Sequence, residues 1–143
     1  MTPDEHHGGH VLETVAAPAS LDEVHALFDE LWGDAPDVVA SDRMALETAV
    51  SEVAANIVEH AAGGRTVSMR LVLEAGRDSV EARLEDAGYP YDEDAVVTAT
   101  GDDDIPERGR GLPLARALTD EIVYERDGPV NRWYLRRQRS TPA

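Results

Sequence analysis

The sequence predicts an α+β fold: a two-layer sandwich in which a mixed, mainly antiparallel sheet carries helices on one face. Two segments with helical periodicity, at about 20–33 and 42–62, come first, and hairpin patterns follow them. Helices and strands therefore do not alternate singly, as they would around a parallel sheet. With 143 residues and no internal repeat, the chain is long enough for one domain.

The first element expected is a strand at 10–15, after a polar lead at 1–9 that is predicted to be disordered. A helix then begins at Ser20, because Ser20 and Glu23 have the spacing of a capping box, in which each side chain bonds a free backbone N–H. Apolar residues recur at helical spacing up to Trp32, and Gly33 ends the helix. This apolar stripe is expected to pack either within the domain or between subunits.

The second helix is expected at 42–62, with Ser41 as its cap and two glycines at 63 and 64 as its stop. Apolar residues then alternate at 67–73 and 80–84 around a turn, which predicts a hairpin.

The last third of the chain begins with a segment of little periodicity at 93–110, which is predicted to be a long loop. A short helix is expected at 112–118. Strand patterns at 122–125 and 130–135 flank an Asp-Gly turn and predict a second hairpin. The folded domain is thus expected to span 10–138, with a tail at 139–143.

Charge and composition exclude several classes of function. Thirteen basic residues against 29 acidic ones give a net charge of −16, which repels nucleic acids and anionic membranes. We therefore expect neither as a direct partner, and a protein partner should be basic or meet a locally distinct patch. The absence of cysteine excludes disulfides and thiolate metal sites. No apolar run is long enough to span a bilayer, and the polar start lacks the apolar region of a signal peptide, which predicts a cytoplasmic protein.

A local reversal of charge occurs at 132–141, where four arginines gather. This segment is expected to be either a docking surface or a solvated strand and tail.

The first candidate site lies on the second predicted helix. Glu52, Asn56 and Glu59 fall within about 60° of one another around the helix axis, and His60 lies beside them. A carboxylate there can accept a proton, and an amide oxygen one turn away can bind Mg²⁺. The pattern alone favours a solvated helix face, so a function depends on what accompanies it.

The second candidate site is Asp86. It follows Val80, Ala82 and Leu84 at a period of two, so its side chain is expected to face the core. A buried carboxylate needs bonding partners, and it can accept a hydrogen bond from the exocyclic amine of adenine. Gly88 would let another group approach the backbone closely. The alternative is that Asp86 belongs to a turn.

The third candidate site is Gly109-Arg110-Gly111, preceded by Arg108 and followed by the short helix. Glycines allow backbone N–H groups to face a phosphate, and the arginines add positive charge. The segment is neither a Walker loop nor a Rossmann fingerprint.

Together, the three sites resemble in order and spacing the motifs of the GHKL ATPase superfamily, which includes gyrase and histidine kinases. Residues 52–61 resemble the N box, 86–92 the first glycine box and 109–114 the second. The Asp-x-Gly-x-Pro-aromatic-Asp form of 86–92 and the Asn131-Arg132 pair resemble the branch of anti-sigma-factor serine-protein kinases.

This resemblance implies a role for each residue. Glu52 is similar to the catalytic base, Asn56 to the Mg²⁺ ligand and Asp86 to the aspartate that reads adenine. Gly88 would shape the adenine pocket, and 93–108 would be the ATP lid. Contacts to ATP are also implied for Arg108, Gly109, Arg110, Gly111 and Leu112.

The resemblance implies an ATP-binding anti-sigma factor with serine-protein kinase activity and with ATP and Mg²⁺ as ligands. It would bind a sigma factor, phosphorylate an anti-anti-sigma (STAS-type) protein and regulate transcription by partner switching. Relatives in this branch are commonly dimers, so a homodimer is a further expectation. Two alternatives stay open: a nucleotide-binding or degenerate module that sequesters a partner without phosphotransfer, and a detached catalytic domain of a histidine kinase.

Overall fold

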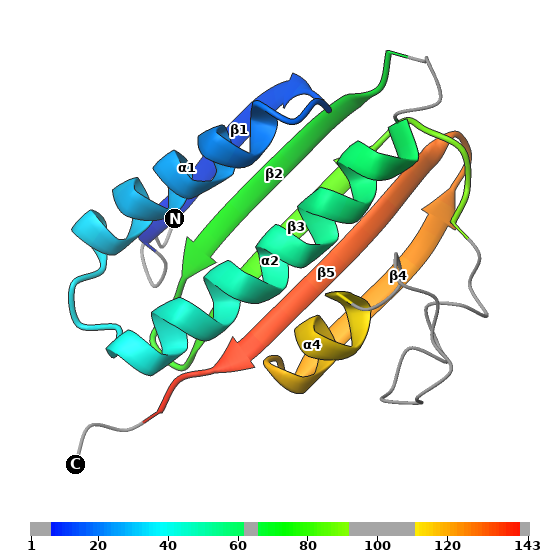
Figure 1. The fold of residues 1–143 in the computed structure, drawn as a ribbon. Helices are drawn as coiled ribbons and strands as arrows, with labels where there is room; N and C mark the ends of the chain where they lie inside the picture. Colours follow the sequence, from blue (N-terminus) through cyan, green and yellow to red (C-terminus); the bar gives the residue numbers. More distant parts are fainter. Residues whose placement is uncertain (1–6, 62–65, 92–110, 141–143) are drawn as a thin grey trace.

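The computed structural model describes residues 7–61, 66–91 and 111–140 of the chain. In chain order, the elements shown in Figure 1 are β1 (His7–Val15), α1 (Ser20–Asp34), α2 (Ala40–Ala61), β2 (Ser68–Ala75), β3 (Ser79–Asp86), α4 (Gly111–Ala117), β4 (Glu121–Asp127) and β5 (Val130–Gln138).

The strands form one sheet in the order β1-β2-β3-β5-β4, and every described pair is antiparallel. The described helices α1, α2 and α4 all cover the same face of this sheet (Figure 1). The predicted α+β class and its layers are confirmed. The predicted mixture of pairings is not seen, because the described strands include no parallel pair.

The core lies between the helices and the strand residues that face them. α1 packs on β1 and β2, whereas α2 packs on β3 and β5. Phe28 and Leu31 of α1 have no exposed surface, so the apolar stripe of this helix packs within the domain. Burial of a side chain of this size contributes roughly 2–3 kcal/mol to folding.

The predicted capping box at the start of α1 is wrong. Ser20 Oγ donates to the carbonyl of Val15 at 2.7 Å and accepts from the backbone N–H of Ala17 at 3.0 Å, and no side chain caps the helix. Glu23 instead accepts a hydrogen bond from Thr14 Oγ1 at 2.8 Å. Ser20 thus binds the end of β1 and the connection after it, and Glu23 binds the end of β1, because both lie within reach of the first turn.

Several predicted boundaries also differ. α2 begins at Ala40, so Ser41 lies inside the first turn and is not its cap. The predicted stop of this helix at 62–64 lies outside the described residues. β1 begins at His7, within the predicted lead, and α1 ends at Asp34, one residue late. The short helix and both hairpins are confirmed, with ends that shift by at most three residues.

The arginines near the end of the chain form ion pairs with the rest of the domain. Arg132 contacts Glu85 and Asp127, while Arg139 bonds Asp37 at 2.9 Å. These contacts show a strand and its continuation, and the expected docking surface stays a prediction. Arg139 therefore belongs to the folded unit, although the sequence suggested a tail there. None of the described helices has the length and apolar character that a membrane span requires.

Candidate functional site

The orientation of α2 decides which residues can meet. Asp42, in the first turn of α2, accepts a hydrogen bond from Arg137 near the end of β5 at 2.9 Å. From Asp42 to Asn56 the helix advances about 21 Å, and from Arg137 back to Asn131 the strand covers about 20 Å. Since α2 packs along β5 in the opposite direction (Figure 1), Asn56 lies over the end of the sheet where β5 begins.

The same end of the sheet holds Asp86. It is the last residue of β3 and pairs in register with Asn131, the second residue of β5. The N box and the first glycine box are thus brought together from positions 30 residues apart. This arrangement follows from the hydrogen bond between Asp42 and Arg137 and from the register of β3 with β5.

Glu52 and Asn56 lie one turn apart on one flank of α2, in a stripe with the buried Ala45 and Ala49. The opposite flank faces α1, because Glu47 accepts hydrogen bonds from α1 side chains. The flank of Glu52 and Asn56 therefore faces α4, which packs on α2. Both side chains are half-buried, whereas Glu59 is exposed.

Asn56 carries a buried polar atom without a described partner. Its Nδ2 has no accessible surface and no hydrogen bond among the described residues. An unsatisfied buried donor costs roughly 1–3 kcal/mol, so proteins seldom keep one without a use. The side chain is therefore arranged for a group other than the described parts of the chain.

Asp86 faces the core, as its period of two predicts, and only 2% of it is exposed. Its Oδ1 accepts hydrogen bonds of 3.0 Å from the backbone N–H of Gly88 and from Asn131 Nδ2. The alternative of a simple turn residue is wrong, because β3 extends to Asp86 itself. A Cβ on Gly88 would lie 3.0 Å from the same oxygen, which explains why glycine suits this position.

Three aromatic side chains pack against one another beside Asp86. The ring of Tyr91 meets Trp133 edge-on with a centroid distance of 5.4 Å, and it meets Tyr124 in the same way at 5.7 Å. Burial raises the pKa of Tyr91 above its ordinary value, and the negative charge of Asp86 raises it further. Tyr91 therefore stays protonated and neutral at physiological pH.

Sequence reasoning missed Asn131, Tyr124 and Trp133 as parts of this site. The signal for Asn131 and Trp133 was present, because both share the inward parity of Leu135 on the final strand. Tyr124 could be found only from the pairing of β4 with β5.

The second glycine box is described only in part. Gly111 begins α4, and Leu112 is buried against the core. Arg108, Gly109 and Arg110 lie outside the described residues, as does the predicted lid at 93–108.

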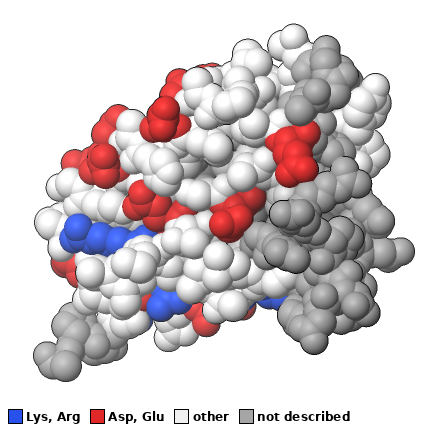
Figure 2. All heavy atoms as spheres, viewed as in Figure 1, with Lys and Arg blue, Asp and Glu red and all other residues white. Residues whose placement is uncertain are grey.

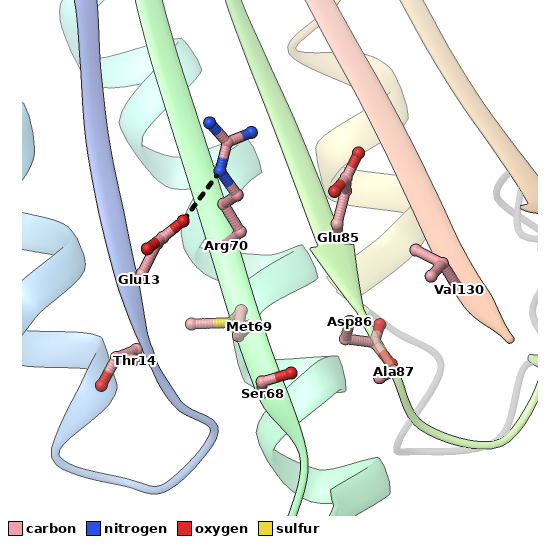
Figure 3. A pocket seen from close by; sticks show the side chains of 9 residues that line it. All are labelled: Glu13, Thr14, Ser68, Met69, Arg70, Glu85, Asp86, Ala87 and Val130. Atoms are coloured by element: carbon pink, nitrogen blue, oxygen red, sulfur yellow. Dashed lines mark hydrogen bonds and ion pairs between the residues drawn. The ribbon is translucent and has the colours of Figure 1, made fainter.

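A hollow of about 310 Å³ near the end of β3 is distinct from this site. Glu13, Arg70 and Glu85 in its lining lie on the face of the sheet away from the helices (Figure 3). Arg70 Nε is already paired with Glu13 Oε2 at 3.2 Å, and the carboxylate of Asp86 is bonded to Asn131. The hollow borders Asp86 but neither Glu52 nor Asn56, so it does not hold the group of residues that the motifs single out.

Comparison with known protein families identifies the fold. The sequence model of the histidine kinase-like ATPase domain matches residues 14–136. The chain belongs to the histidine kinase-like ATPase domain family. The match contains all three motif segments, and it confirms the superfamily that their order suggested. A search of curated proteins found no significant match.

The histidine kinase-like ATPase domain implies ATP as a ligand, and the described residues fit it. A buried carboxylate on a strand end suits the amine of adenine, and the Tyr91–Trp133 pair offers an apolar neighbour for a base. On the flank that faces α4, the unpartnered Nδ2 of Asn56 suits a phosphate oxygen, and the oxygen of the same amide is the atom that would bind a metal ion. The described residues contain no cluster of His, Asp and Glu that would hold a metal alone.

Proposed function

We propose that the protein is an ATP-dependent serine-protein kinase that also binds a sigma factor and phosphorylates an anti-anti-sigma (STAS-type) partner. The observation that carries the proposal is the placement of Glu52 and Asn56 on one flank of α2, above the strand end that holds Asp86. This arrangement provides a proton acceptor, a metal ligand and a carboxylate that can bind adenine within one half of the domain.

In this proposal, Asp86 accepts a hydrogen bond from the adenine amine and Asn56 is the side chain that holds Mg²⁺. The metal, when bound, neutralises charge on the phosphates. Glu52 accepts the proton of a serine hydroxyl while the serine oxygen forms a bond to the γ-phosphorus. The bond from that phosphorus to the β–γ bridging oxygen breaks, and ADP leaves.

A groove next to Glu52 supports a protein as the phosphate acceptor. It has a volume of about 500 Å³, lies between α1 and α2, and includes Trp32, Met44 and Glu52 in its lining. Met44 is 70% exposed, which leaves an apolar side chain for contact with a partner. A protein segment lying in this groove would bring a hydroxyl to Glu52.

The acidic surface supports release of the product. Figure 2 shows acidic side chains spread over the face that the helices cover. A phosphoserine adds about two negative charges and would be repelled by this face. Phosphorylation would therefore weaken binding of the anti-anti-sigma partner and leave the protein available to the sigma factor.

The test is transfer of label from γ-labelled ATP to a purified STAS-type partner. Glu52→Gln should lower the rate at least about 100-fold and leave ATP affinity nearly unchanged, because only the proton acceptor is lost. Glu30→Gln is the matched control, since it makes the same change at an exposed position of a helix, outside the lining of the groove. Undiminished transfer by Glu52→Gln would overturn the role of Glu52.

The stability of the label distinguishes the alternatives. Acid-stable label on serine supports the proposal, whereas acid-labile label on histidine indicates a histidine kinase domain. ATP binding without any transfer indicates a module that only sequesters its partner.

A further inference from the structure

Asn131 is a wholly buried polar residue to which the proposed reaction gives no role. It lies on β5 and pairs in register with Asp86 of β3 on one side and with Arg126 of β4 on the other. These three neighbours form a row across the sheet: a carboxylate, an amide and a guanidinium. The amide lies between the two opposite charges.

The hydrogen bonds of Asn131 fix its amide in one orientation. Nδ2 donates to Asp86 Oδ1 at 3.0 Å and to the carbonyl of Tyr89 at 2.8 Å. Oδ1 accepts from the hydroxyl of Tyr124 at 2.5 Å and from Arg126 Nη1 at 3.2 Å. A flipped amide would place its oxygen against a carboxylate and its N–H groups against a guanidinium, so the observed orientation is the stable one.

The same network holds the segment that follows β3. Arg126 Nη1 donates to the carbonyl of Gly88 at 2.7 Å. The backbone N–H of Tyr91 donates to the hydroxyl of Tyr124 at 3.0 Å. The hairpin of β4 and β5 therefore holds both the Asp86 carboxylate and the backbone after it.

We propose that Asn131 is a positioning residue that gives the nucleotide site its preference for a 6-aminopurine over a 6-oxopurine. This inference rests on the proposed binding of ATP at Asp86. A carboxylate selects an amine only while its plane is fixed, because a side chain that can turn away no longer rejects a carbonyl. The Asn131 Nδ2 donor, together with the N–H of Gly88, fixes that plane.

The experiment compares the affinities of Mg·ATP and Mg·ITP by calorimetric titration. ITP carries a carbonyl where ATP carries the 6-amino group, and the two share the same phosphates. We expect the wild type to prefer ATP on the order of 100-fold. Asn131→Ala should reduce that preference about tenfold, mainly by weakening ATP binding, because the carboxylate loses the Asn131 Nδ2 donor.

Two further variants make the result specific. Tyr124→Phe removes one donor to the Asn131 oxygen and should lower the preference in the same direction, about threefold; it carries the test if Asn131→Ala does not fold. Arg132→Ala is the matched control, because Arg132 follows Asn131 in the chain but its side chain is exposed and paired with Glu85. It should leave the preference unchanged.

The outcomes separate this inference from the proposed function. A wild type that prefers ATP, with an equal preference in folded Asn131→Ala and Tyr124→Phe, overturns the positioning role alone. Equal losses of ATP and ITP affinity would also overturn it, since a purely structural residue would produce them. A wild type that binds neither nucleotide overturns the proposed function together with this inference.

Discussion

Asp42 Oδ1, on the first turn of α2, accepts a 2.9 Å hydrogen bond from Arg137 Nε near the end of β5. Asp42 has no exposed surface, and its Oδ2 accepts a 2.7 Å hydrogen bond from the backbone N–H of Ser140. Arg137 also donates to the carbonyl of Leu118, just after α4. This pair thus joins α2 and the end of α4 to β5, and it fixes where along the sheet Asn56 lies.

Replacement of Arg137 by Met should lower the free energy of unfolding by roughly 2–4 kcal/mol, because it leaves the buried carboxylate of Asp42 without its ionic partner. Urea denaturation measures the change. Arg132→Met removes an exposed ion pair on the same strand and should cost less than about 1 kcal/mol. Equal costs for the two variants would contradict the structural role of Arg137.

Low pH should weaken the contribution of the Asp42–Arg137 pair to stability. Burial opposes ionisation of Asp42, but hydrogen bonds from Ser140 and Arg137 outweigh it, so the pKa of Asp42 in the folded protein lies below its ordinary value of 3.8. Its ionised form therefore contributes stability above pH 3.8, and this contribution is lost as the pH falls through the lower, folded value.

Denaturation from pH 7 down to about pH 2 checks this in the wild type and in Asp42→Asn. The difference between their unfolding free energies should be constant near neutral pH and should shrink in acid. A difference that does not change with pH would show that the Asp42 charge adds nothing.

Gly88→Ala should weaken ATP binding on the order of tenfold, because the new Cβ forces the Asp86 carboxylate to move and strains its hydrogen bond to a base. The Cβ would lie 3.0 Å from Asp86 Oδ1, and the nearest other atom, on Val67, is 3.5 Å away. Gly33→Ala is the control, since a Cβ there has no heavy atom within 4 Å. It should leave binding unchanged and stabilise α1 by about 0.5–1 kcal/mol.

Periodicity predicted the layers, and it predicted that Asp86 faces inward, because residue parity is a local property of a strand. The helix starts were less predictable: Ser20 and Ser41 have the residue type of a cap, but the hydroxyl of Ser20 bonds Val15 and α2 already begins at Ala40. The burial of Asn131 could be predicted from its parity, but its contact with Asp86 could not, since Asp86 is 45 residues away and the strand order decides that they meet.

Asn56→Leu should separate stability from function. Asn56 Nδ2 is buried without a partner among the described residues, so an apolar side chain of similar size should raise the unfolding free energy of the ligand-free protein by about 1 kcal/mol. The same change removes the amide that we expect to hold Mg²⁺. Mg·ATP at 100 times its Kd should stabilise the wild type by about 2.7 kcal/mol and the variant much less.

Ser51→Ala is the matched control for this prediction. Ser51 Oγ, also on α2, is likewise buried without a described partner. Ser51 lines the groove between α1 and α2, so it lies away from the flank of Asn56. The variant should gain stability and keep the full effect of Mg·ATP in thermal unfolding. An Asn56→Leu protein that is destabilised without ligand, or that responds to Mg·ATP as the wild type does, would show that this amide serves the fold and not the nucleotide.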